Sequence, residues 1–281
     1  MERSYVRPET IDALLEALET PGAAILCGGT DLMVKLRAGL VDPSLLVDIS
    51  GLEALRGVRD EDGGIVIGAA TPETELLEND AVRQRLPLLV AALETLGSVQ
   101  IRNRGTLGGN LVNASPAADG ALPLLLHDAE VVLASRGGVR RMPVEAFIVS
   151  PGKTQLRAGE FVQEIRIPAV DEEAVGRLHK VGRRRALTIA IASVGMLCRI
   201  REGRIAWIRL AAGSVAPRPI RLRPVEEALT GHVLDAELIP EARALAASAV
   251  SPIDDIRGTA EYRRGVVADL VAAFLSEICD A

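Results

Sequence analysis

Two glycine pairs, about eighty residues apart, are the residues best suited to bind a phosphate group. Gly28 and Gly29 lie in ILCGGTDLMV, between a predicted buried strand and a helix that Thr30 is expected to cap. Such a turn leaves backbone N–H groups without partners, and the following helix dipole attracts an anion. An ordinary strand-to-helix turn has the same pattern, so this loop alone leaves both interpretations open.

The second pair lies in IRNRGTLGGNLVNASPAADG, residues 101–120. Here Gly105, Gly108 and Gly109 allow a ligand to approach the backbone closely. The side-chain amides of Asn110 and Asn113 add hydrogen-bonding groups. The alternatives are a surface loop and a second site for the same phosphate-bearing cofactor.

The residues that follow this pair refine the hypothesis. Ser115 and Pro116 predict the N-cap and the first residue of a helix, a second place where an anion is attracted. Asp119 would repel a phosphate but can accept a hydrogen bond from a sugar hydroxyl. Two glycine loops and one sugar-binding acid predict a dinucleotide.

The common phosphate-binding motifs are missing. The chain has no GxGxxG, and the spacing in GTLGGN differs from that fingerprint. PGKT at 151–154 is no P-loop, because Phe147 occupies the position of its first glycine. GRRRAL at 182–187 is either a solvated loop or a cationic lid over a nucleotide or partner.

The composition of the chain argues against several classes of protein. The chain has 281 residues, 48% of them hydrophobic, and a net charge of -6, which disfavours nucleic acid as a partner. It begins without an apolar leader, and its longest apolar run, 187–198, is short of the ~18–20 residues that span a bilayer, so we expect a cytoplasmic protein. The three cysteines and three histidines are scattered and predict no disulfide framework, cluster or metal site.

Periodicity places the loops on an α+β scaffold. A helix over 11–19, a strand over 23–27 and the helix after Thr30 form a small α/β unit. Strands, helical segments over 72–96 and a strand ending at Pro168 follow. A polar boundary at 168–173 precedes three strands, two of them joined by a hairpin at 201–203, and then helices.

Four segments, in this order and spacing, resemble the FAD-binding subunit of the xanthine dehydrogenase and carbon monoxide dehydrogenase family of molybdenum hydroxylases. They are AILCGGTDLMVKLRAG, IRNRGTLGGNLVNASPAADGALPLLLHDAEVVL, GRRRALTIAIASV and SPIDDIRGTAEYRRGVVADL. The resemblance covers nearly the whole chain. It implies the FAD-binding fold of vanillyl-alcohol oxidase (PCMH type), with two FAD-binding subdomains at 1–55 and 56–169 and a C-terminal α+β domain at 170–281.

The resemblance also implies where FAD binds, without a covalent bond. The two glycine loops would hold its diphosphate, Asp119 its sugar portion, apolar residues its flat rings, and Lys180 the flavin or the phosphates. The implied contacts are Ile25, Leu26, Cys27, Gly28, Gly29, Thr30, Asp31, Leu32, Leu96, Thr106, Gly108, Gly109, Asn110, Asp119, Val162 and Lys180. No side chain is expected to act as a catalytic acid or base.

Such subunits work in complexes. The resemblance implies a small partner with two [2Fe-2S] clusters and a large partner with molybdopterin, from which electrons reach FAD and then NAD⁺ or another acceptor. In xanthine dehydrogenases the loop matching 182–190 carries acidic residues, whereas Leu187 and Thr188 stand here, which leaves the acceptor open. Two other hypotheses keep the fold: a free-standing flavin oxidoreductase and a scaffold subunit without flavin.

Overall fold

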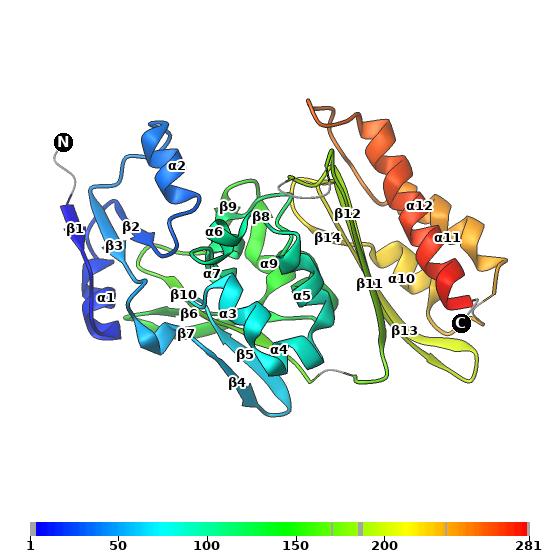
Figure 1. Cartoon of the computed structure of the whole chain (residues 1–281), viewed down its shortest axis with the longest axis horizontal. Helices are drawn as coiled ribbons and strands as arrows, with labels where there is room; N and C mark the ends of the chain where they lie inside the picture. Colours follow the sequence, from blue (N-terminus) through cyan, green and yellow to red (C-terminus); the bar gives the residue numbers. More distant parts are fainter. Residues whose placement is uncertain (1–3, 170, 185–187, 234, 280–281) are drawn as a thin grey trace.

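The computed structural model describes residues 4–169, 171–184, 188–233 and 235–279. Three main sheets follow one another along the long axis in the order of the chain, with the N-terminal strand at one end and the C-terminal helices at the other (Figure 1). The fold is α+β, as the sequence predicts. None of the described helices is both long and apolar enough to cross a lipid bilayer.

The first sheet has three parallel strands in the order β1-β3-β2. Its elements are β1 (Ser4–Val6), α1 (Ile11–Ala17), β2 (Ala23–Leu26), α2 (Leu32–Arg37) and β3 (Leu45–Asp48). Helix α1 begins where the sequence predicts, because the Thr10 hydroxyl accepts a hydrogen bond from the Ala13 N–H. The core of this sheet includes Ala134 and Phe161 from the second sheet, so the two sheets pack against each other.

The second sheet has five antiparallel strands in the order β4-β5-β10-β6-β7. Its elements, with the segments that connect them, are η1 (Glu53–Leu55), β4 (Val58–Glu61), β5 (Gly64–Gly68), α3 (Glu73–Glu78), α4 (Asp80–Arg85), α5 (Pro87–Glu94), α6 (Val99–Arg102), α7 (Leu107–Asn113), α8 (Ala121–Leu126), β6 (Glu130–Ser135), β7 (Gly138–Pro143), α9 (Val144–Phe147), β8 (Ile148–Ser150), β9 (Lys153–Thr154) and β10 (Phe161–Ile167). Leucines from these helices form a large hydrophobic core with β5, β6 and β10. Strand β10 comes last in sequence but lies at the centre of the sheet, and its first residue, Phe161, packs in the core of the first sheet.

The C-terminal sheet has four antiparallel strands in the order β11-β12-β13-β14. Its elements are β11 (Val175–Val181), β12 (Ala192–Arg201), β13 (Arg204–Gly213), β14 (Ile220–Arg221), α10 (Arg223–Leu229), α11 (Leu238–Ser248) and α12 (Ala260–Cys279). These three helices cover one face of the sheet (Figure 1). Helix α8 packs on the other face. A methyl group at Gly195 would lie 2.8 Å from the Leu126 side chain, so the missing side chain lets α8 approach closely.

The predicted hairpin between β12 and β13 is confirmed. Glu202 and Gly203 both have positive φ, 51° and 72°, as a two-residue type I′ turn requires. The three sheets lie within residues 4–48, 58–167 and 175–221. Whether the units 1–55, 56–169 and 170–281 are separate domains stays a prediction, which limited proteolysis would test.

The predictions for the starts of helices near the glycine pairs were wrong. Thr30 does not cap α2: its N-cap is Asp31, whose side chain makes no cap hydrogen bond. No helix begins at Ser115 and Pro116, because the Ser115 hydroxyl accepts from the Ala117 N–H in a tight turn and α8 begins only at Ala121. Short polar side chains form caps and turns by the same local hydrogen bond, which explains the error.

The second glycine pair lies inside a helix and not in the predicted turn. Helix α7 begins after Thr106, whose hydroxyl accepts from the Gly109 N–H, and it ends at Ala114, where φ is 50°. Gly108 and Gly109 are therefore helical residues despite the low helix propensity of glycine. The Thr106 cap and contacts with the rest of the fold outweigh that propensity.

Candidate cofactor-binding site

The two glycine segments meet at one cavity of about 290 Å³ between α2, α7 and β10. Most of the predicted contacts line it: Ile25, Cys27, Gly28, Gly29, Thr30, Asp31, Leu32, Leu96, Thr106, Gly108, Gly109, Asn110 and Val162. Residues far apart in sequence thus share one wall. The structure brings together the two loops on which the dinucleotide hypothesis depends.

Direct packing joins the two segments beside this cavity. A methyl group at Gly28 would lie 1.8 Å from the carbonyl oxygen of Arg104, which is far below any allowed contact. Gly29 has a φ of 75°, a conformation that other residues rarely adopt. The first glycine pair is therefore required by the backbone itself, before any ligand is considered.

This packing yields a prediction for Gly28→Ala. The added methyl group must push the Arg104 backbone away, so we expect the free energy of unfolding to fall by about 3 kcal/mol, at the upper end for overpacking. Urea denaturation measures it. Gly265→Ala in α12 is the matched control: its methyl group meets no atom within 4 Å, so the helix should gain about 0.5–1 kcal/mol. Equal stability of the two variants would contradict the close contact.

The first loop supplies backbone donors. Among the described residues, no acceptor bonds to the N–H groups of Gly29, Thr30, Asp31 and Leu32. All four residues line the cavity. Consecutive unpaired N–H groups beside a cavity suit the oxygen atoms of a phosphate. This is the chemistry that the sequence predicts for the first glycine loop.

The second segment has few free donors. The Gly108 N–H donates to the Ala69 carbonyl at 3.2 Å, and the Gly109 N–H donates to the Thr106 hydroxyl at 3.1 Å. Gly109 contributes space instead. A methyl group there would approach only the Thr106 hydroxyl, at 3.0 Å, whereas one at Gly108 would lie 2.6 Å from the Ala69 carbonyl oxygen. Gly108 is thus needed for packing, and Gly109 leaves room on the cavity side.

Three predicted contacts do not line the cavity: Leu26, Asp119 and Lys180. Leu26 ends β2, and its side chain lies against Gly29. Asp119 and Lys180 form an ion pair of 2.5 Å, with side chains only 13% and 9% exposed. Burial raises the pKa of Asp119, and the Lys180 ammonium opposes that rise. The two residues contact each other, so their direct role toward a sugar or a phosphate stays a prediction.

Lys35 and Glu73 are two charged residues that line the cavity but were not among the contacts predicted from the sequence. The Lys35 ammonium bonds Asn113 at 2.7 Å and Asp31 at 2.6 Å, so it bridges α2 and α7. Lys35 lies four residues after Asp31, a spacing that could have predicted this ion pair from the sequence. Glu73 has no such signal, because it lies far from both glycine pairs in sequence and reaches the cavity only through the fold.

Much of the remaining wall is apolar. Leu96 and Val162 lie where the resemblance implied, and the other apolar residues are Ile49, Ala69, Ile101, Val112, Leu156 and Phe161. Flat rings can pack against such a surface and bury apolar area. The residues therefore fit a dinucleotide, because the same cavity offers unpaired N–H groups and an apolar surface.

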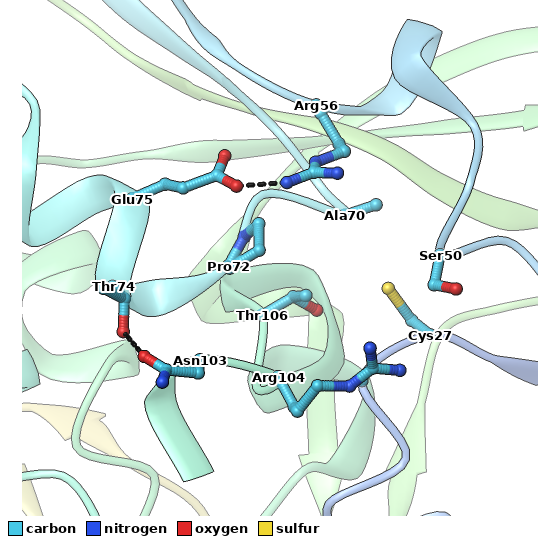
Figure 2. A pocket seen from close by; sticks show the side chains of 11 residues that line it. Cys27, Ser50, Arg56, Ala70, Pro72, Thr74, Glu75, Asn103, Arg104 and Thr106 are labelled. Atoms are coloured by element: carbon cyan, nitrogen blue, oxygen red, sulfur yellow. Dashed lines mark hydrogen bonds and ion pairs between the residues drawn. The ribbon is translucent and has the colours of Figure 1, made fainter. Parts of the chain in front are cut away.

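A second cavity of about 220 Å³ adjoins the first, and most of the side chains that line it are polar (Figure 2). Its polar side chains are Cys27, Ser50, Arg56, Thr74, Glu75, Asn103, Arg104 and Thr106. Arg56 pairs with Glu75, and the Thr74 hydroxyl bonds Asn103 at 2.6 Å. Cys27, Gly28 and Thr106 line both cavities, so the contact between the glycine segments lies between them. Burial raises the pKa of the Cys27 thiol, so the thiol is protonated.

Comparison with known proteins identifies the family. Residues 1–170 match the model of the FAD-binding domain in molybdopterin dehydrogenase. The chain belongs to this family. Residues 177–278 of this FAD-binding subunit match a second model, the C-terminal domain of the CO dehydrogenase flavoprotein. The resemblance found in the sequence is confirmed, FAD is the cofactor, and the subunit is part of an oxidoreductase.

Similar proteins match over almost their whole length. The glyceraldehyde dehydrogenase medium chain of Sulfolobus acidocaldarius is 34% identical over 99% of this chain and 98% of its own. The xanthine dehydrogenase FAD-binding subunit of Escherichia coli O157:H7 is 34% identical over 98% and 95%. The structure of carbon monoxide dehydrogenase from Hydrogenophaga pseudoflava superposes with a TM-score of 0.93, 30% identity and coverage of 97% and 96%. The PCMH-type fold is thereby confirmed.

Proposed function

We propose that this subunit binds FAD non-covalently in the larger cavity, receives electrons from an iron–sulfur partner and passes them to NAD⁺ or another acceptor. The observation that carries the proposal is the meeting of the unpaired N–H groups of residues 29–32 with the open side of Gly109 at one cavity. Bound FAD supplies the redox chemistry, because a flavin accepts single electrons and gives up a hydride.

The protein's own contribution is placement. The N–H groups of residues 29–32 hold the diphosphate, and Gly109 leaves room for it. Leu96 and Val162 cover the flat rings and exclude water. The proposed contacts remain those predicted from the sequence, with Lys35 added, and no side chain is assigned as a catalytic acid or base.

The partners follow from the family and from the cysteines. Relatives are named as medium chains or as FAD-binding subunits, so they work beside other chains. A [2Fe-2S] cluster is typically held by four cysteines, and this sequence has three. We propose a small iron–sulfur subunit as electron donor and a large molybdopterin subunit as the site of substrate oxidation, in the cytoplasm.

We expect the segment 182–190, between β11 and β12, to influence which electron acceptor is used. Leu187, where xanthine dehydrogenases carry acidic residues, lies outside the described residues together with Arg185 and Ala186. Arg183 donates a hydrogen bond to the Ile256 carbonyl, so this first arginine of GRRRAL is held against the segment before α12. NAD⁺ as acceptor is a proposal that stopped-flow reduction of the complex, followed by addition of NAD⁺, would test.

Purification from the native host tests the function as a whole. We expect a yellow protein with one FAD per chain, together with a chain that carries iron–sulfur clusters and a chain that carries molybdenum. Absorption spectra and metal analysis measure these contents. A colourless chain that takes up no added FAD would contradict the cavity assignment. A yellow chain that never copurifies with the two partners would favour a free-standing flavin enzyme.

A further inference from the structure

Glu73 is a buried acid on the wall of the cofactor cavity. It is the first residue of α3, and only 2% of it is exposed. No described residue donates a hydrogen bond to its carboxyl group, and the oxygen Oε2 is buried without a partner. Its backbone N–H donates to the Gly105 carbonyl at 2.9 Å, which fixes α3 beside the glycine segment. Since an unpaired buried carboxylate is unfavourable, either a proton or a ligand must satisfy it.

The charged groups around Glu73 favour the proton. The guanidinium of Arg102 on α6 stabilises the carboxylate, but it bonds the Leu96 and Gly97 carbonyls and makes no ion pair with Glu73. Asp119, before α8, opposes ionisation, and Lys180 on β11 is already paired with Asp119.

The charges across the cavity do not change this balance. Asp31, the N-cap of α2, and Lys35 on α2 lie on the same cavity wall and neutralise each other. Cys27 carries no charge as a protonated thiol. Burial raises the pKa of Glu73 from 4.5 to about 7. A carboxyl group that is normally ionised at neutral pH therefore holds its proton into the neutral range.

We propose that Glu73 is a further FAD-binding residue that accepts the cofactor only as a neutral acid, with its hydroxyl donating a hydrogen bond into the cavity. The inference rests on the proposed function of this cavity. The diphosphate of FAD would bring negative charge into the same low-dielectric space, which further favours the proton. FAD binding and protonation of Glu73 therefore support each other.

The affinity for FAD should consequently fall as the pH rises. With a pKa of about 7 in the free protein, the dissociation constant rises about tenfold between pH 6 and pH 8. In Glu73→Gln the amide still donates a hydrogen bond but does not titrate, so its dissociation constant stays near the wild-type value at pH 6. Both dissociation constants are measured by the quenching of flavin fluorescence when FAD is added to the flavin-free full chain.

Two control variants localise the effect. Glu75→Gln changes an acid two residues away that pairs with Arg56 outside this cavity, and it should keep the wild-type pH dependence. Asp119→Asn removes a charge that opposes ionisation of Glu73, so in this variant the loss of FAD affinity with rising pH should persist but begin at lower pH. A pH dependence that disappears in Asp119→Asn and persists in Glu73→Gln would overturn the assignment.

Stability of the flavin-free chain gives an independent readout. The folded pKa of about 7 exceeds the ordinary value of 4.5, so the folded state binds the proton more tightly. The contribution of the Glu73 proton to stability is therefore fully present below pH 4.5 and is lost as the pH rises through about 7. We expect the wild-type melting temperature to fall across this window by more than that of Glu73→Gln. Parallel curves for the two proteins would reject a buried, protonated Glu73.

The possible results distinguish failure of the role of Glu73 from failure of the proposed FAD-binding function. A wild-type chain that binds FAD with the same affinity at pH 6 and pH 8 keeps the proposed function and rejects the role of Glu73. An affinity that rises with pH rejects it too, because the carboxylate would then accept a hydrogen bond from FAD. A chain that binds no FAD at any pH rejects both.

Discussion

Gly109→Val is expected to abolish FAD binding and to leave the protein folded. The valine side chain would occupy the open side of α7, where the only close atom is the Thr106 hydroxyl and where the diphosphate is proposed to lie. Loss of the phosphate contacts should weaken binding by at least 100-fold, about 3 kcal/mol or more. Fluorescence titration with FAD measures the affinity, and circular dichroism the fold.

A graded series makes this prediction specific. Gly109→Ala adds one methyl group near a hydroxyl that can move, so its affinity should lie between those of the wild type and the valine variant. Gly265→Val places the same side chain on α12, where its Cβ atom would meet no described residue within 4 Å beyond the helix's own backbone, and should bind FAD normally. Stoichiometric FAD in purified Gly109→Val would show that the diphosphate lies elsewhere.

The glycine pairs show how far sequence reasoning reaches. Their meeting at one cavity could be predicted through the family resemblance, which implies that both glycine segments hold the diphosphate. Their individual roles could not. Gly28 accommodates a carbonyl group, Gly29 has a positive φ, and Gly109 leaves space. Glycine meets all three of these structural requirements, so the sequence alone does not distinguish them.

The overall fold was predictable to a similar degree. Alternating and helical patterns located most strands and the long C-terminal helix, because burial of one face imposes the period. The helix expected at Ser115 was wrong because a serine hydroxyl closes a turn as readily as it caps a helix. Tertiary contacts, which the sequence pattern does not contain, decide between these two uses.

Glu73 and Lys180 show what could not be predicted about the site from the sequence. Glu73 reaches the cavity only because α3 packs beside the glycine segment, so no local pattern marks it. Asp119 and Lys180 were both predicted as FAD contacts, yet the ion pair between them emerged only from the structure. Pairwise contacts between distant segments are what the fold adds to the sequence.

The ion pair of Asp119 and Lys180 joins three parts of the fold. Lys180 belongs to β11 of the C-terminal sheet, Asp119 lies between α7 and α8, and the ammonium also donates to the Thr95 carbonyl after α5 at 3.1 Å. Asp119→Asn or Lys180→Met leaves one buried charge unpaired, so each should cost about 3 kcal/mol of stability. The double variant should cost less than the sum, with a coupling of about 2 kcal/mol in urea denaturation.

The same double-mutant cycle distinguishes two roles of Asp119 toward FAD. If Asp119 bonds the cofactor's sugar directly, Asp119→Asn weakens FAD binding by about 1–3 kcal/mol, and adding Lys180→Met restores nothing. If Asp119 acts by holding the segment after α7 in place through Lys180, both single variants weaken binding alike and the double variant partly recovers. The geometry favours the second result, because the carboxylate is 2.5 Å from the ammonium and does not line the cavity. Unequal single variants without recovery would assign Asp119 to the sugar.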